Sequence, residues 1–185
     1  CHKELQANKE RMLILPEFIE FLKYLKSSNN RKYQNIYQDI TKGRNPWRAE
    51  WLDADFKMIS GKLCLNYNHV LNPNGKLIPK NSEILNPNTL MGTEISKIDL
   101  EDLLNSNHTT QGFPNTNVKS GRLSYEHPGS DNDSVARFVA RINRTSLICC
   151  RGPFEVHSYL GVRAAKENSG KIFINSSGSR LKEKI

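Results

Sequence analysis

The first part of the chain contains two stretches with helical periodicity. In both, apolar residues recur at i, i+3, i+4 and i+7: Phe18, Phe21, Leu22 and Leu25, then Tyr33, Ile36, Tyr37 and Ile40. Pro16 fits the first turn of the first helix, and Gly43 followed by Asn45-Pro46 ends the second. We expect each apolar stripe to pack on the chain's own core or to form a seam between two copies of the chain.

The pattern changes to short apolar runs between residues 47 and 88. Turn residues separate these runs at Ser60-Gly61, at 72–75 and at 86–88. Such punctuation predicts short strands and loops.

A third helix is predicted farther along the chain. It begins at Ser96, whose spacing to Asp99 resembles a capping box, and Leu100, Leu103 and Leu104 follow. The polar residues 105–133 are predicted to form a long loop.

Residues 134–150 alternate with the two-residue period of a β-hairpin. One face, expected to meet the core, contains Ala136, Phe138, Ala140 and Ile142, and continues with Leu147 and Cys149 after a turn near Asn143-Arg144. The opposite face, expected to point outward, contains Val135, Arg137, Val139, Arg141, Ser146, Ile148 and Cys150. Because solvated strand faces favour Lys, Glu and Thr, this mixture predicts a contact surface.

The composition is that of a polar chain with enough apolar residues for a core. Of the 185 residues, 37% are hydrophobic and 25% are charged, and the mean hydropathy is −0.62. The pattern predicts an α+β fold, with a helical segment at residues 1–44 and a main domain at 45–185. No stretch reaches the roughly 18 apolar residues of a membrane helix, and no basic-then-apolar leader is visible, so no membrane span is expected.

Charge and cysteine usage narrow the possible partners. The net charge of +8 suits an acidic partner or simply a lysine-rich surface. The four cysteines show no CxxC pair and no zinc-type spacing to histidine, so no metal is expected. If the adjacent Cys149 and Cys150 lie on a strand, one faces the core and the other is exposed.

Three runs of residues resemble a known family: Ser134-Val135-Ala136-Arg137-Phe138, Leu147-x-Cys149-x-Arg151-x-Pro153 and Leu160-Gly161-Val162-Arg163-Ala164-Ala165. Together they resemble the carboxy-terminal variable region of proteins diversified by diversity-generating retroelements. Those proteins are similar to the C-type lectin fold in its formylglycine-generating-enzyme-like branch. The resemblance implies a C-type lectin-like domain with a variable region at about 134–165.

The resemblance further implies a receptor-recognition protein on a virion or microbial surface that binds a ligand, with no catalytic residue, cofactor or metal. Framework positions stay fixed while the positions between them are altered at template adenines. The implied variable, ligand-facing set is Val139, Arg141, Ile142, Ser146, Ile148, Cys150, Gly152, Phe154, Val156, His157 and Tyr159. The alternative is an ordinary hairpin with Val139, Ile148 and Phe154 in its core. Arg137, Arg151 and Arg163 fall in the framework and are expected to make structural hydrogen bonds.

The residue types in the segment agree with this mechanism. Randomised adenines in an Asn codon that ends in a pyrimidine cannot yield Lys, Gln, Met, Trp or Glu. Between Ser134 and Ala165 there is no Lys, Gln, Met or Trp, and the one Glu is Glu155. Buried strands also exclude these residue types.

The alternative function is a metal-dependent, nucleic-acid-cleaving enzyme that uses Asp39, Asp55 and Lys57. Asp55-Phe56-Lys57 has the D-x-K form found in such nucleases. Two carboxylates and a lysine would hold a divalent ion and polarise a phosphate.

Histidines offer a further nuclease or metal site, at Asn68-His69 together with His108 or His127. An RNA-binding module is not predicted, because the chain has no aromatic RNP-like strand and no GXXG loop.

Overall fold

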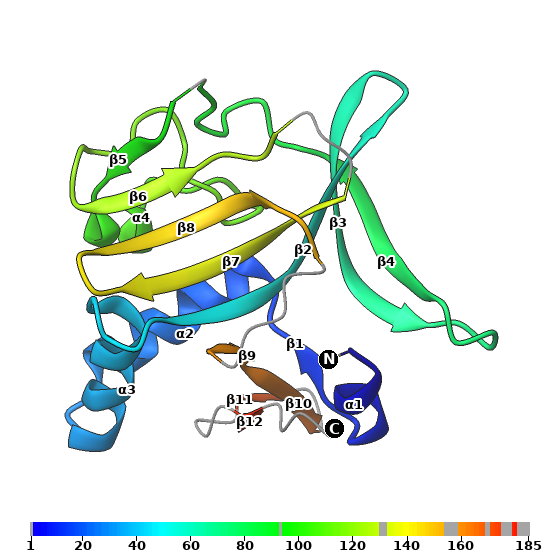
Figure 1. Cartoon of the computed structure of the whole chain (residues 1–185), viewed down its shortest axis with the longest axis horizontal. Helices are drawn as coiled ribbons and strands as arrows, with labels where there is room; N and C mark the ends of the chain where they lie inside the picture. The colour runs from blue at the N-terminus through cyan, green and yellow to red at the C-terminus, as the bar shows by residue number, and fades with distance from the viewer. Residues whose placement is uncertain are drawn as a thin grey trace.

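The computed structural model describes residues 2–92, 94–129, 133–153, 159–168, 171–174 and 179–180. The fold is mixed α+β and mostly sheet, as the sequence predicts (Figure 1). The helices are α1 (His2–Ala7), α2 (Leu15–Ser27), α3 (Arg31–Thr41) and α4 (Leu100–Asn105). The strands are β1 (Arg11–Met12), β2 (Arg48–Ile59), β3 (Lys62–Leu71), β4 (Leu77–Ile84), β5 (Ser96–Ile98), β6 (Leu123–Glu126), β7 (Ser134–Arg141), β8 (Arg144–Arg151), β9 (Leu160–Val162), β10 (Ala164–Asn168), β11 (Lys171–Ile174) and β12 (Ser179–Arg180).

The strands of the described residues form two sheets. The larger has the order β12-β9-β2-β7-β8-β6-β5, with the β3–β4 hairpin attached to β2. Most of its neighbours are antiparallel, whereas β9 lies parallel to β2 and β6 parallel to β8. The smaller sheet has the order β1-β10-β11. The segment Leu160–Ala165 therefore passes from β9 in the larger sheet to β10 in the smaller one.

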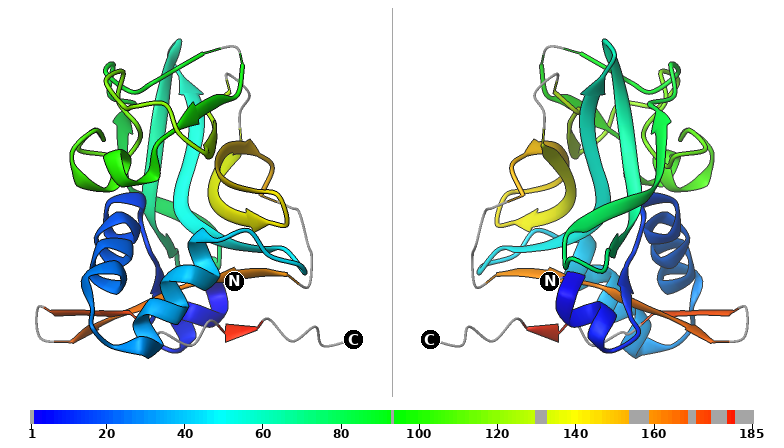
Figure 2. Two further views of the ribbon diagram at one scale, coloured as in Figure 1. Left: turned by 90° about the vertical axis from the view of Figure 1, so that its left-hand side faces the viewer. Right: turned by 90° about the vertical axis from the view of Figure 1, so that its right-hand side faces the viewer.

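The two predicted amino-terminal helices are confirmed as α2 and α3. Figure 2 shows α2 on one side of the β7–β8 hairpin, and the rings of Phe18 and Phe138 lie with their centroids 5.5 Å apart. The apolar stripe of α2 is buried in the main core, and so are Tyr37 and Ile40 of α3. Most of these apolar residues therefore pack within the chain, and Tyr33 and Ile36 of α3 are partly buried against the same core. No described helix is long and apolar enough to cross a membrane.

The middle of the chain differs from its prediction in three places. Residues 48–84 form three long strands rather than short ones, although the turns at Ser60-Gly61 and 72–75 are present. The third helix begins after Asp99, whose side chain accepts the N–H of Asp102, whereas Ser96 lies in β5. The predicted loop 105–133 contains β6, which pairs with both β5 and β8.

The β7–β8 hairpin is present, but both of its faces are buried. Phe138 and Leu147 belong to the main core, as predicted. Val139 and Ile148, predicted to face outward, are fully buried on the second face with Ala49 and Leu160, and Ser146 is also fully buried. The prediction is wrong for these residues because β2 and β9 add apolar side chains to that face. Ile142, which the alternation assigned to the core face, lies instead in the turn and is 64% exposed, so that assignment is wrong.

Candidate functional site

The candidate site lies where β2 changes its neighbour. Along one edge β2 pairs with β7, and along the other it pairs first with β9, at Ala49–Trp51, and then with β3, at Asp55–Ile59. The pairing with β7 is irregular between Trp51 and Asp55. At this fork the N–H of Asp53 donates to the carbonyl of Leu13, at 2.8 Å. The fork separates β9 from β3 and leaves space between them.

Alternate residues of β2 point into this space. Trp51, Asp53, Asp55 and Lys57 line a cavity of 410 Å³. Leu52, Ala54 and Phe56, which lie between them, belong to the main core, although Leu52 and Ala54 also border the cavity. The two-residue period of the strand therefore puts two carboxylates and one ammonium group on the cavity side.

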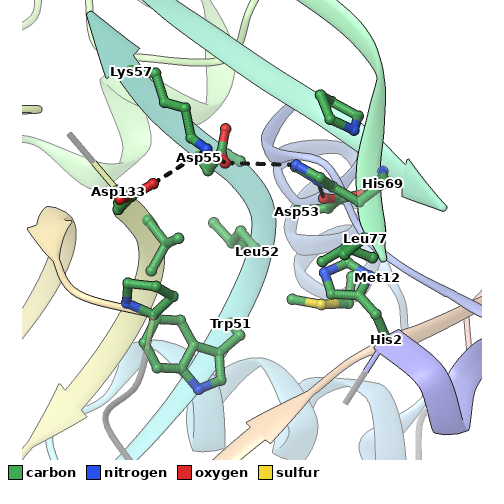
Figure 3. A pocket seen from close by; sticks show the side chains of 14 residues that line it. His2, Met12, Trp51, Leu52, Asp53, Asp55, Lys57, His69, Leu77 and Asp133 are labelled. Carbon is green, nitrogen blue, oxygen red and sulfur yellow. Dashed lines mark hydrogen bonds and ion pairs between the residues drawn. The ribbon is translucent and has the colours of Figure 1, made fainter. Parts of the chain in front are cut away.

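His69 of β3 lies between the two carboxylates (Figure 3). Its Nδ1 bonds Oδ1 of Asp53, its backbone N–H donates to Oδ2 of Asp53 at 3.0 Å, and its Nε2 is 3.7 Å from Oδ2 of Asp55. Asp53 and His69 are both buried. Beyond Asn66, β3 is no longer paired with the main chain of β2. The carboxylate of Asp53 accepts the main-chain N–H of His69 instead.

The two aspartates determine the charge of His69. Burial by itself would lower the pKa of His69, but hydrogen bonds from Asp53 and Asp55, together with their negative charges, raise the pKa to about 9. In the absence of a bound cation, His69 is therefore an imidazolium at neutral pH. Its positive charge offsets part of the cost of burying Asp53.

Helix α1 brings a second histidine to the same place. Gln6 donates to the carbonyl of His69 at 3.0 Å and accepts the N–H of Leu71 at 2.9 Å, so it fixes α1 against the free edge of β3. Residues four apart share a helix face, and His2 therefore lies above His69, with ring centroids 5.7 Å apart. Burial lowers the pKa of His2 despite the attraction of Asp53.

The opposite side of the cavity holds a salt bridge. Nζ of Lys57 lies 3.2 Å from Oδ1 of Asp133 and 3.9 Å from Oδ2 of Asp55. Val135 of β7 and Pro153, just after β8, complete this wall. The cavity therefore touches the segment that carries the family resemblance.

Three of these side chains form a set that could hold a metal ion. One ligand atom from each of His2, Asp53 and His69 lies within 4.8 Å of the other two. Asp55 is next to the set, and its Oδ1 is buried without a hydrogen-bond partner among the described residues. The arrangement could bind a divalent cation at the edge of a cavity large enough for a small ligand.

The predicted nuclease residues are only partly brought together. Asp55 and Lys57 share the cavity, but Asp39 lies on α3, is largely exposed and pairs with Arg44 at 3.8 Å. Asp39 does not line the cavity, so the grouping of all three is wrong. In a helix that packs by its Tyr37–Ile40 face, Asp39 points to the other side.

The predicted histidine pairs are also wrong. His108 bonds the carbonyl of Leu103 at 2.6 Å, and His127 lies 3.2 Å from the carbonyl of Pro128. Neither lines the cavity that contains His69. The partners of His69 are Asp53, Asp55 and His2 instead.

The predicted variable set divides into three groups. Val139, Ser146 and Ile148 are buried, so an outward position is wrong for them. Exposed or half-buried members are Arg141, Ile142, Cys150, Gly152 and Tyr159. Phe154, Val156 and His157 lie outside the described residues. Cys149 is buried and Cys150 exposed, which confirms the prediction for the cysteine pair.

Two of the three framework arginines, Arg151 and Arg163, make the expected structural hydrogen bonds, and Arg137 makes a cation–π contact. Arg163 is buried and donates to Glu50 at 3.0 Å, and Arg48 donates to the same carboxylate oxygen at 2.8 Å. Arg151 donates to Glu126 at 3.4 Å. The guanidinium of Arg137 lies 5.3 Å from the ring centroid of Trp51.

Sequence reasoning missed Asp53, His2 and Gln6. The alternation of Trp51, Asp53, Asp55 and Lys57 with apolar residues was a visible sign that both aspartates share a strand face. No local pattern connects His2 to His69, because Gln6 joins them through contacts made only in the folded chain.

Comparison of the chain with protein-family models, with curated proteins and with solved structures gives no match.

Proposed function

We propose that this protein binds a ligand by displaying exchangeable side chains on a C-type lectin-like scaffold, as a receptor-recognition protein diversified by a retroelement. It acts by binding and not by catalysis. The family resemblance of residues 134–165 suggests the scaffold, and the distribution of buried and exposed side chains among the described residues of this segment is the observation that carries the proposal.

Burial in the described part of this segment follows the division between framework and variable positions only in part: the framework residues Arg151 and Pro153 are exposed, and three variable positions are buried. Framework residues Phe138, Leu147 and Cys149 are buried on the main core side, and Leu160–Ala165 are buried as well. By contrast, the positions at the β7–β8 turn and after β8 are exposed or half-buried. Exchange of an exposed side chain costs little stability, which is what a diversified surface requires.

Buried positions limit how much of the set can vary. Val139, Ser146 and Ile148 have no exposed surface to present. We therefore restrict the proposed recognition surface, among the described residues, to Arg141, Ile142, Cys150, Gly152 and Tyr159. Tyr159 packs against Trp47 with ring centroids 5.8 Å apart, which holds an aromatic side chain at this surface.

The test is to sequence the coding region in many natural copies together with its neighbouring DNA. We expect a near-identical template repeat and a reverse transcriptase gene nearby. Substitutions should gather at the codons for the exposed positions, while those for Phe138 and Leu147 stay constant. Codons of the β3–β4 hairpin are the internal control. Evenly spread substitutions, or a locus without the repeat and the gene, would overturn the proposal.

One observation favours a second candidate, metal-dependent cleavage of nucleic acid. Asp53, Asp55 and Lys57 meet at one cavity, and the chain has a net charge of +8. A magnesium-dependent cleavage assay on the full chain and on Asp55→Ala separates the candidates. Cleavage that requires Asp55 supports the nuclease, whereas equal, background-level cleavage by both proteins rejects it.

A further inference from the structure

We propose that His2, Asp53 and His69 bind a divalent transition-metal ion of the Zn²⁺ type at the fork of β2, with one coordination position open to the cavity. This site uses none of the exposed positions in the proposed recognition surface. It is therefore independent of the proposed function.

The separation of the three ligand atoms fits one ion. Their mutual distances are at most 4.8 Å. Nitrogen and oxygen ligands about 2.0–2.2 Å from a metal lie roughly 3–4.4 Å apart, so small side-chain rotations are enough to close the set. Two imidazoles and one carboxylate are a recurring three-ligand set for such ions.

The surroundings hold the ligands in place. The backbone N–H of His69 donates to Oδ2 of Asp53, so this carboxylate keeps its orientation while Oδ1 exchanges its hydrogen bond with Nδ1 of His69 for the ion. The imidazole ring of His69 releases a proton to solvent in this exchange. Gln6 fixes α1 to β3 at two points and thereby positions His2. Each ligand thus comes from an element held by contacts other than the metal.

Asp55 gives an independent reason to expect a cation. Its Oδ1 is buried and lacks a hydrogen-bond donor among the described residues, and its Oδ2 is 3.7 Å from Nε2 of His69. Lys57 and His69 both lie beside Oδ2 of Asp55, so Oδ1 keeps the cost of an unpartnered buried oxygen, which a cation next to it would lower. The adjoining cavity of 410 Å³ gives an ion and its remaining ligand a route of entry.

The donor atoms select the kind of ion. Ca²⁺ and Mg²⁺ prefer oxygen ligands throughout, whereas imidazole nitrogen suits Zn²⁺, Co²⁺ and their neighbours. Among the described residues the set contains no cysteine, which distinguishes it from zinc sites of the CxxC type.

Co²⁺ titration of the full chain, without a polyhistidine tag, tests the proposal by visible absorption. We expect a saturable d–d band at one equivalent of Co²⁺ that Zn²⁺ displaces and excess Mg²⁺ does not. His2→Ala should weaken Co²⁺ binding roughly 100-fold, and Asp53→Asn should do the same. His127→Ala and Asp39→Asn, which alter the same residue types outside the cavity, should bind like the parent.

Circular dichroism and urea unfolding show which variants remain folded. Since His2 lies at the edge of the fold on a short helix, His2→Ala decides the question even if Asp53→Asn unfolds. Absence of a saturable band in the parent overturns the proposal. So does a band that persists in folded His2→Ala, or one that falls equally in His127→Ala.

Discussion

The side-chain amide of Gln6 donates to the carbonyl of His69, 3.0 Å away, and so joins the first helix to a strand more than sixty residues later. The same side chain accepts the N–H of Leu71 at 2.9 Å. Gln6 therefore satisfies two main-chain groups on the part of β3 that has separated from β2.

Gln6→Ala is expected to lower the free energy of unfolding by about 1–3 kcal/mol, because two main-chain groups lose their partner. Urea unfolding measures the effect, and hydrogen exchange at the amide of Leu71 should become faster. Gln34→Ala is the matched control, since Gln34 makes its hydrogen bond to Ser28 at an exposed position. An unfolding free energy equal to that of the control would show that the two hydrogen bonds of Gln6 to β3 do not stabilise the fold.

Ile142 and Ile148 provide a paired test of the hairpin, because they are 64% and 0% exposed. Ile148→Ala should cost about 2–5 kcal/mol through the cavity it leaves. Ile142→Ala should change stability by no more than about 0.5 kcal/mol. Thermal or urea unfolding of both variants gives the comparison, and equal losses would mean that the second face of the hairpin is not covered.

Glu50 is buried between Arg48 and Arg163. Glu50→Met should destabilise the protein by about 3–5 kcal/mol, because Arg163 is left as a buried charge without its carboxylate. The double variant Glu50→Met/Arg163→Met should lose less than the sum of the two single variants. Urea unfolding of all four proteins completes the cycle. Strict additivity would show that the two side chains are not coupled.

Cys150 is exposed, yet burial of its sulfur and then the charge of Glu126 raise the pKa of its thiol. At a pH below the pKa of the thiol, a lower pKa increases the thiolate fraction and hence the rate of alkylation. Glu126→Gln removes the negative charge, so iodoacetamide should modify Cys150 roughly threefold faster or more. Peptide mass mapping follows the site, with Glu83→Gln as control. An unchanged rate would mean that Glu126 does not act on the thiol.

Local patterns in the sequence were enough to predict elements that depend on their own residues. The stripe of Phe18, Phe21, Leu22 and Leu25 predicted α2, and the turn residues at Ser60-Gly61 predicted a strand boundary. Distant partners account for what was missed. Ser96 and Asp99 are both good helix caps, but pairing of Ser96 with Tyr125 places it in a strand.

The hairpin and the cavity show the same limit more strongly. The alternation of residues correctly predicted that Phe138 and Val139 point to opposite faces of the hairpin. It did not predict that Ala49 and Leu160 would pack with Val139 on the second face. At His69 the alternation is interrupted by Asn68, which has a φ of 56°. Leu65 and Tyr67 contact the main core, whereas His69 lies on the cavity side. Residue spacing in the sequence therefore cannot predict the direction of the His69 side chain, because the positive φ of Asn68 changes the direction of the strand.

The fork in β2 has a consequence for the order of assembly. β2 and β3 are joined by the turn at Ser60-Gly61, so their hairpin closes a short loop and can form as soon as those residues leave the ribosome. β9 can pair with the other half of β2 only after synthesis has passed residue 162. Until then the second edge of β2 at Ala49–Trp51 is an open sheet edge in the nascent protein, which chaperones or other strands can reach.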